Sequence, residues 1–382
     1  MHINWICIPS FLFFWEDLTS AIRHIGKSCA EGNIVKRLLL VFILLVCLCV
    51  GADAEMLTYG GTGDDVILDM AAGADERVVL TGYTTSSDGT LSDRTKTGHS
   101  GWVMCLDAQG NVLWNFCSRH DVLDRMRHPV IHEDGTVSVI LYSVNSASEQ
   151  IREEWIHLSA DGKVLEREYI PGSGGVFFLV GEHGYIQAQT GETRRDFYLI
   201  EWGGTERTLL DIECEESFQL EEVSGRYFLA DSWDSGHMLF AFDENMRGRE
   251  WAKWSGVPAQ RQYRRILELK DGSLVAIGRE DAAVSASRVF THWDKAGNVL
   301  TDIPFESDMP RYICETENRI LTLDYDGRLI LLDHEGNAVW QELTEMAVPS
   351  GMVVTSDGRA VIAADRGGKG EKDVKVCMLQ IQ

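Results

Sequence analysis

Three short stretches of this chain place arginine side chains close together, although the chain carries a formal net charge of −24. Each stretch enters a run of apolar residues, and the members are Arg125, Arg127 and His128, then Arg261, Arg264 and Arg265, then Arg311. Guanidinium groups bind carboxylates and phosphates through paired hydrogen bonds. If the fold brings these stretches together, we expect them to hold a carboxylate, a phosphate or an acidic sugar. The competing interpretation is local pairing with nearby acidic residues, because surface ion pairs are common and contribute little energy.

Aromatic side chains offer a second kind of binding chemistry, which is stacking against a sugar ring. Trp233 lies beside the polar stretch Asp234–His237 and is the predicted stacking residue. Six other tryptophans recur at related positions of a repeat, and such repetition indicates packing between units. They are Trp102, Trp114, Trp155, Trp251, Trp293 and Trp340.

The sequence contains no motif of a known catalytic centre. It has neither G-x-S-x-G nor H-E-x-x-H, and the glycine-rich stretch Gly60–Asp65 lacks the Lys-Ser/Thr of a phosphate loop. His120, His128 and His132 do not have the spacing of a zinc site, and two adjacent aspartates do not make a calcium cage. We therefore expect no metal and no cofactor, and we assign no catalytic residue.

The elements that must position these residues are strands. After Glu55 the chain repeats a unit of four apolar strands with tight turns, first seen as DDVILDMAAG, ERVVLTGYT, GWVMCLDAQG and NVLWNF. Seven such units, of about 40 to 50 residues each, predict an all-β, seven-bladed β-propeller of four-stranded antiparallel blades. Six or eight blades stay open as alternatives, because the third and fourth units match loosely. The seventh unit lacks its fourth strand, and we expect Glu55–Tyr59 to supply it and close the ring.

Three phrases of the first unit resemble the propeller repeats of bacterial secreted and surface proteins. They are GGTGDD (Gly60–Asp65), VVLTGYT (Val78–Thr84) and GWVMCLDAQGNVLW (Gly101–Trp114). The last phrase is also similar to the tryptophan-docking phrase of quinoprotein-like propellers in the wider WD40-like group. This resemblance implies a propeller fold and a bacterial extracytoplasmic setting, and it transfers no quinone-binding or catalytic residue.

Long polar loops are predicted on one face of such a propeller, where the second strand leads to the third and one unit leads to the next. They cover residues 84–100, 143–153, 280–288 and 365–373. Loops raised on a rigid scaffold are frequent binding sites, so we expect a partner on this face.

A leader precedes the repeats. Lys36-Arg37, a run of apolar residues and the A-x-A site Ala52-Asp53-Ala54 predict a signal peptide over residues 35–54, with cleavage after Ala54. The predicted protein is therefore secreted or extracytoplasmic, and it meets a membrane only through this segment if it stays uncleaved. Residues 1–34 are predicted to be an untranslated upstream extension, with the true start at Val35, and residues 55–382 to form a single propeller domain.

The cysteines after the leader show no metal-binding spacing, and a bridge among them is left open: Cys105, Cys117, Cys214, Cys314 and Cys377. The acidic surface argues against nucleic-acid binding.

The sequence thus predicts a secreted, non-enzymatic propeller that binds a glycan, an acidic small molecule or a surface protein. The expected binding residues are Arg127, His128, Arg264, Arg265, Arg311 and Trp233. One alternative is an extracytoplasmic enzyme with its site in the central funnel, such as a glycosidase, a polysaccharide lyase or a quinone-dependent oxidoreductase. Another is a pure scaffold.

Overall fold

The computed structural model describes residues 55–381, with gaps at 92–97, 119–122, 145–150, 171–176, 181–183, 191–194, 202–205, 211–218, 225–226, 233–235, 244–247, 255–260, 282–285 and 366–372. The described residues belong to one unit, Ala54–Gln382. The leader and upstream extension, the stacking residue Trp233, and Cys214 lie outside them. The four predicted binding loops are described only in part, because each contains one of these gaps.

Every strand in the described residues belongs to a four-stranded sheet whose neighbours pair antiparallel. The first sheet contains β2 (Asp65–Ala72), β3 (Val78–Thr84), β4 (Ser100–Leu106) and β5 (Val112–Cys117), with a 3-10 turn η1 (Gly89–Leu91) between β3 and β4. The second contains β6 (Leu123–Ile131), β7 (Val137–Val144), β8 (Ile151–Leu158) and β9 (Val164–Tyr169). The third contains β10 (Phe177–Val180), β11 (Gly184–Thr190), β12 (Arg195–Glu201) and β13 (Arg207–Leu209).

The remaining sheets follow the same order along the chain. The fourth contains β14 (Gln219–Ser224), β15 (Tyr227–Ser232), β16 (Gly236–Phe242) and β17 (Arg249–Trp254). The fifth contains β18 (Arg261–Glu268), β19 (Leu274–Asp281), β20 (Ala286–Trp293) and β21 (Val299–Pro304). The sixth contains β22 (Tyr312–Glu315), β23 (Ile320–Leu323), β24 (Arg328–Leu332) and β25 (Ala338–Leu343). The seventh contains β26 (Gly351–Val354), β27 (Arg359–Ala364), β28 (Val374–Gln380) and β1 (Glu55–Tyr59).

The D-x-x-G-N phrases form the tight turns between third and fourth strands. Asp107 Oδ1 accepts hydrogen bonds from the backbone N–H of Gln109 (2.9 Å) and of Asn111 (2.8 Å), and the Asn111 amide donates to Oδ2 (2.9 Å). These bonds, led by the Asn111 side chain, lower the pKa of the Asp107 carboxyl. Gly110 has φ +80°, a backbone conformation that glycine adopts without strain. The motif is therefore a structural turn.

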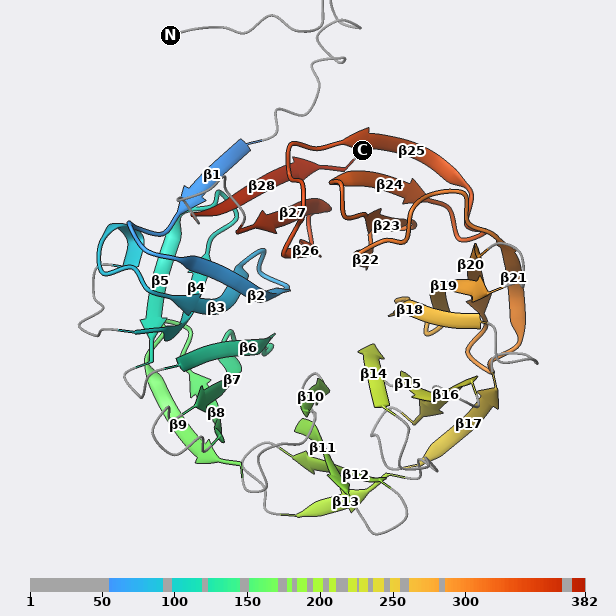
Figure 1. The fold of residues 1–382 in the computed structure, drawn as a ribbon, viewed down its shortest axis with the longest axis horizontal. Helices are drawn as coiled ribbons and strands as arrows, with labels where there is room; N and C mark the ends of the chain where they lie inside the picture. Colours follow the sequence, from blue (N-terminus) through green and yellow to red (C-terminus); the bar gives the residue numbers. More distant parts are fainter. Residues whose placement is uncertain are drawn as a thin grey trace, which may run out of the picture. The chain divides into compact units, whose positions relative to one another are not determined.

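The sheets surround a common axis in Figure 1, with the first strand of each unit innermost. These innermost strands contact one another in chain order: β2 with β6, β6 with β10, β10 with β14, β14 with β18, β18 with β22, β22 with β26, and β26 with β2. Because the last contact returns to the first strand, the described sheets close into a ring.

The core lies between the faces of neighbouring sheets. Trp102 is fully buried in a cluster that also contains Met378 of the seventh sheet. Trp155 packs with Ile200 of the third sheet, and Trp293 belongs to a cluster spanning the fourth and fifth sheets. The predicted packing between units is confirmed for Trp102, Trp155 and Trp293, whereas Trp340 is exposed and the side chain of Trp251 lies outside the described residues.

The seventh sheet is completed by the strand at the other end of the described chain. Glu55 pairs with Met378 and Tyr59 with Val374, and the Tyr59 hydroxyl donates a hydrogen bond of 2.5 Å to the carbonyl of Gly110. The prediction of an all-β propeller of four-stranded antiparallel blades is confirmed, and so is the closing role of Glu55–Tyr59.

Candidate functional site

Two of the three predicted basic stretches lie on innermost strands that contain β-bulges, whereas Arg311 directly precedes β22, as predicted. β6 shifts register between Arg127 and Val130, and β18 shifts between Tyr263 and Arg265. A bulge re-aims side chains away from strict alternation. From their place before runs of apolar residues, these basic stretches were predicted to lie in the connections that enter the innermost strands. That placement is wrong for β6 and β18, because both stretches pair as part of the strand.

His128 is held against an acidic residue of the neighbouring sheet. Its backbone N–H donates to Asp69 Oδ2 (3.1 Å), and its ring Nδ1 lies 3.4 Å from the same oxygen. The φ of His128 is +52°, so the bulge keeps it in a left-handed conformation. Asp69 itself follows a register shift in β2, between Ile67 and Asp69. Two bulges on adjacent innermost strands therefore bring the imidazole and the carboxylate together.

Arg265 and Arg311 meet at the border of the fifth and sixth sheets. Arg265 Nε donates to the backbone carbonyl of Arg311 (2.5 Å). The Arg311 guanidinium lies over two phenol rings, 5.9 Å from the centroid of Tyr312 and 5.7 Å from that of Tyr325. At these distances the cation is attracted to the negative faces of the rings. Arg311 is therefore held in place by aromatic contacts.

Burial raises the pKa of the Tyr312 phenol, and the neighbouring guanidinium groups of Arg311 and Arg265 lower it. The Asp69–His128 contact and the Arg265–Arg311–Tyr312 contact are two separate groups, and both lie at innermost strands. We refer to their residues together as the inner-strand cluster: Asp69, His128, Arg265, Arg311 and Tyr312.

The other predicted binding residues are placed less completely. Arg127 is exposed. Arg125 lies over the ring of Tyr83, 5.6 Å from its centroid, and that ring stacks on His99. Arg264 occupies the bulge of β18, and its side chain, like Trp233, lies outside the described residues.

Sequence reasoning missed Asp69 and Tyr312. Asp69 is a charged residue inside an apolar run, which was a usable signal, whereas Tyr312 follows Arg311 in an ordinary strand pattern.

The glycine-rich stretch before β2 serves the fold. Asp65 is fully buried, and it accepts hydrogen bonds from the hydroxyls of Thr84 (2.5 Å) and Ser86 (2.8 Å) and from the N–H of Gly61 (2.8 Å). Because these donors satisfy its carboxylate, Asp65 is a structural residue. No cluster of three potential metal-ligating side chains occurs within the described ranges.

No disulfide joins two of the described cysteines, which are Cys105, Cys117, Cys314 and Cys377. Burial raises the pKa of Cys105 and of Cys377 to about 11 and that of Cys314 to about 12. Such thiols stay protonated and unreactive. In the same part of the chain, no helix is long and apolar enough to cross a bilayer.

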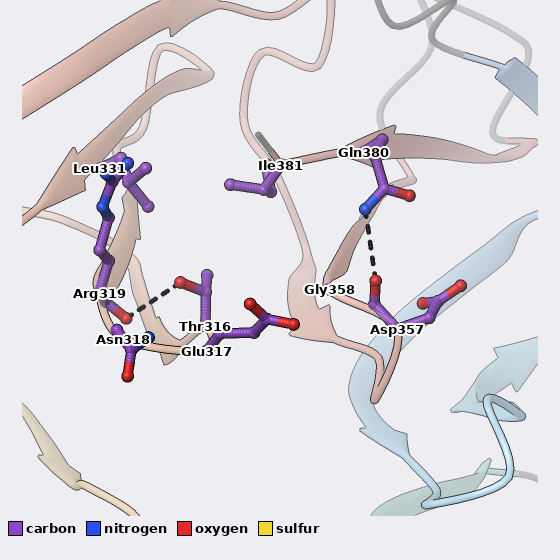
Figure 2. A pocket seen from close by; sticks show the side chains of 9 residues that line it. All are labelled: Thr316, Glu317, Asn318, Arg319, Leu331, Asp357, Gly358, Gln380 and Ile381. Atoms are coloured by element: carbon purple, nitrogen blue, oxygen red, sulfur yellow. Dashed lines mark hydrogen bonds between the residues drawn. The ribbon is translucent and has the colours of Figure 1, made fainter.

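A polar groove of about 450 Å³ lies between the sixth and seventh sheets (Figure 2). It opens on the face that carries the tight turns between the first and second strands and between the third and fourth strands. This face is opposite the predicted binding loops. Its lining residues are Thr316, Glu317, Asn318, Arg319, Leu331, Asp357, Gly358, Gln380 and Ile381. Figure 2 shows Arg319 extending beside Leu331 on one wall, with Gln380 and Ile381 on the other.

The strand order defines the class of the protein, which is an all-β propeller of four-stranded blades. Solved structures with similarity to this chain include BamB from Moraxella catarrhalis, with 14% identity, coverage of 82% of this chain and 86% of that chain, and a TM-score of 0.41. The Dos1 propeller has 11% identity, covers 85% and 93%, and scores 0.48, while the C-terminal WD40 domain of Sif2 has 10% identity, covers 85% and 98%, and scores 0.48. No protein-family model and no curated protein sequence matches the chain. The likeness concerns the fold alone.

Proposed function

We propose that this chain is a secreted, seven-bladed, non-enzymatic propeller that binds a partner through a carboxylate or phosphate group. The single observation that carries the proposal is the inner-strand cluster. Four sheets supply its two contact groups, in which an imidazole meets a carboxylate and two guanidinium groups meet beside a phenol. Converging donors of this kind recognise planar anions with defined geometry.

The competing interpretation is that the cluster neutralises itself. Asp69 contacts His128 directly, and Arg265 donates to a backbone carbonyl. The exposed Arg127 precedes His128 in β6 and adds a further guanidinium group to this region. Basic residues gathered at innermost strands of an otherwise acidic chain favour an anionic ligand.

The test uses an array of acidic and neutral glycans, with inorganic phosphate as a small probe in calorimetry. We expect acidic glycans to bind, and Arg311→Ala or Arg265→Ala to weaken binding about tenfold or more, because each removes a charge-assisted hydrogen bond. Lys163→Ala is the control, since Lys163 is a cation that pairs with Asp161 at 2.5 Å in an exposed tight turn outside the predicted binding loops.

Unchanged affinity in both arginine variants would end the proposal. Turnover of a bound glycan would instead favour the enzyme alternative. A protein that binds neither acidic glycans nor phosphate would favour the scaffold alternative.

Secretion is tested separately, because it rests on the leader motif alone. We expect the mature protein from the culture medium to begin at Glu55, and the precursor to begin at Val35. N-terminal sequencing measures both. A peptide from residues 1–34 in the precursor would contradict the second expectation.

A further inference from the structure

The groove between the sixth and seventh sheets lies at the place where an arginine and a tryptophan fasten the first sheet to the second. In the first sheet, Arg77 donates to the carbonyls of Ala160 (3.4 Å) and Gly135 (3.2 Å) on the second sheet. Trp114 Nε1 donates to the same carbonyl of Ala160 (3.0 Å). A Cβ on Gly162 would meet the indole at 2.6 Å, so the ring lies directly against this glycine. One tight turn of the next sheet is thus held by two donors and an indole ring.

The seventh sheet repeats the arginine contact with the first. Arg359 donates to the carbonyl of Ala108 and lies 3.5 Å from Glu76. Ala108 holds the same place in its turn as Ala160 does in the second sheet, because each turn closes through the same pair of backbone hydrogen bonds. Arg77 and Arg359 also hold equivalent positions at the ends of their turns. The Arg77 carbonyl accepts a hydrogen bond from the N–H of Gly73, and the Arg359 carbonyl accepts one from the N–H of Thr355.

The sixth sheet carries both donors, but its neighbour offers no such turn. The Arg319 carbonyl accepts the N–H of Thr316 (2.8 Å), which gives Arg319 the position of Arg77. Trp340 pairs with Leu331, next to a bulge, as Trp114 pairs with Cys105. Neither the Arg319 guanidinium nor the Trp340 indole has a hydrogen-bond partner among the described residues, and Trp340 is 38% exposed.

The missing turn has a topological cause. In the seventh sheet the third strand is β28 and the fourth is β1, which come from opposite ends of the described chain. No turn joins them within the described residues. By register, Gln380 and Ile381 hold the places of Ser159 and Ala160 of the second sheet, and they border a groove at the place where Gly162 lies in that sheet.

We propose that this groove binds a tight turn of another polypeptide. A backbone carbonyl of the turn accepts hydrogen bonds from Arg319 and Trp340, and a glycine of the turn lies against the indole. Glu317 and Asp357 in the lining favour a turn that carries a lysine. The proposal is independent of the anion-binding function, because the groove is on the other face and uses other residues.

The probe is an N-acetylated, C-amidated, fluorescein-labelled peptide of sequence LSADGKV, which is the turn that Arg77 and Trp114 hold within this protein. Its binding to the full chain is followed by fluorescence anisotropy. We expect saturable binding that Arg319→Ala and Trp340→Phe each weaken about tenfold, because each removes a donor. The matched control is Arg328→Ala, at the other end of the sixth sheet, and it should leave binding unchanged. Both test residues are exposed or half-buried, and thermal melts verify that the variants fold.

A second probe replaces the peptide's glycine by valine. We expect this peptide not to bind, since a Cβ at that place would overlap the indole ring. No saturable binding of LSADGKV at millimolar concentration would overturn the proposal, and so would equal binding by the Arg319→Ala/Trp340→Phe double variant. A Trp340 indole N–H already protected from solvent exchange without peptide would mean that residues ahead of Glu55 fill the groove, which would also overturn it.

Discussion

Glu153 is a buried carboxyl group in the wall of the second sheet. Its side chain is 4% exposed, and its Oε2 has no hydrogen-bond partner in the described part of the chain. Burial alone raises the pKa of Glu153 from 4.5 to about 7. At pH values between these two pKa values, Glu153 keeps its proton in the folded protein but has released it in the unfolded chain. The free energy of unfolding therefore falls as pH rises from about 4.5 through 7.

Glu153→Gln should remove this pH dependence. At pH 8 we expect the variant to be more stable than the wild type by roughly 2–3 kcal/mol, and at pH 4 the two should be equal, because the glutamine mimics the protonated acid. Urea unfolding at several pH values measures the difference. The control is Glu154→Gln, which weakens contacts with Arg152 and Arg167 and should destabilise at pH 8. An unchanged pH slope in Glu153→Gln would contradict the assignment.

Gly162 is the glycine under the Trp114 ring. Gly162→Ala should lower the free energy of unfolding by about 2–4 kcal/mol. The added Cβ is strained at the left-handed φ of +79°, and it also overlaps the indole ring. Gly358→Ala has a similar φ of +82° but meets only Gln380 Nε2, at 3.7 Å, so it should cost about 1–2 kcal/mol. Thermal unfolding of the two variants separates the indole contact from backbone strain. Equal costs would show that the indole contact contributes nothing.

The inner-strand cluster could be predicted only in part at this scale. The sequence pointed to His128, Arg265 and Arg311, because basic residues are conspicuous in an acidic chain. It did not point to Asp69 or Tyr312. Asp69 meets His128 only because bulges in two adjacent innermost strands bring them together, and no local pattern encodes such bulges.

Among the elements, the strand pattern was the most predictable feature and the bulges were the least. Apolar alternation with D-x-x-G-N turns located the strands of the first, fifth and sixth sheets well. A bulge depends on how two strands pair, so the shifts at Arg127 and Tyr263 left no mark in the sequence. Hence the stretches at Arg125–His128 and Arg261–Arg265 were expected in connections but belong to strands, whereas Arg311 does precede its strand.

β1 is the element on which closure depends. Deletion of Glu55–Tyr59 should leave β28 as an open edge beside an exposed core, and we expect the variant to aggregate at moderate temperature. Added peptide EMLTYGG should restore a monomer, because an extended peptide can add a strand to an open edge. Light scattering and melting temperature measure both effects. A peptide with Leu57 replaced by Asp is the control, since Leu57 packs on the core. A deletion variant that melts like the wild type would refute this role.

At the scale of the whole molecule, the ring is held shut by the β1–β28 pair. Met56 lies opposite Cys377 in this pair, so Met56→Cys can form a disulfide across it. The bridge would close a loop of nearly the whole described chain, and we expect up to about 5 kcal/mol of added stability under oxidising conditions. Melting with and without dithiothreitol measures it, with Met56→Ser as the control. A melting temperature that reductant does not change would argue against close pairing of these strands.

By itself the sequence determined the strands, the turns and the four-stranded unit, because these depend on contacts between residues near each other along the chain. It also determined that one end of the chain would complete the unit at the other, since an incomplete sheet leaves unpaired backbone groups. Only the tertiary structure decided which side chains meet at the innermost strands, and that Arg319 lines a groove next to Leu331, the strand partner of Trp340. Those outcomes depend on contacts between distant strands, whose geometry is set by the closed ring and by bulges that the local pattern does not record.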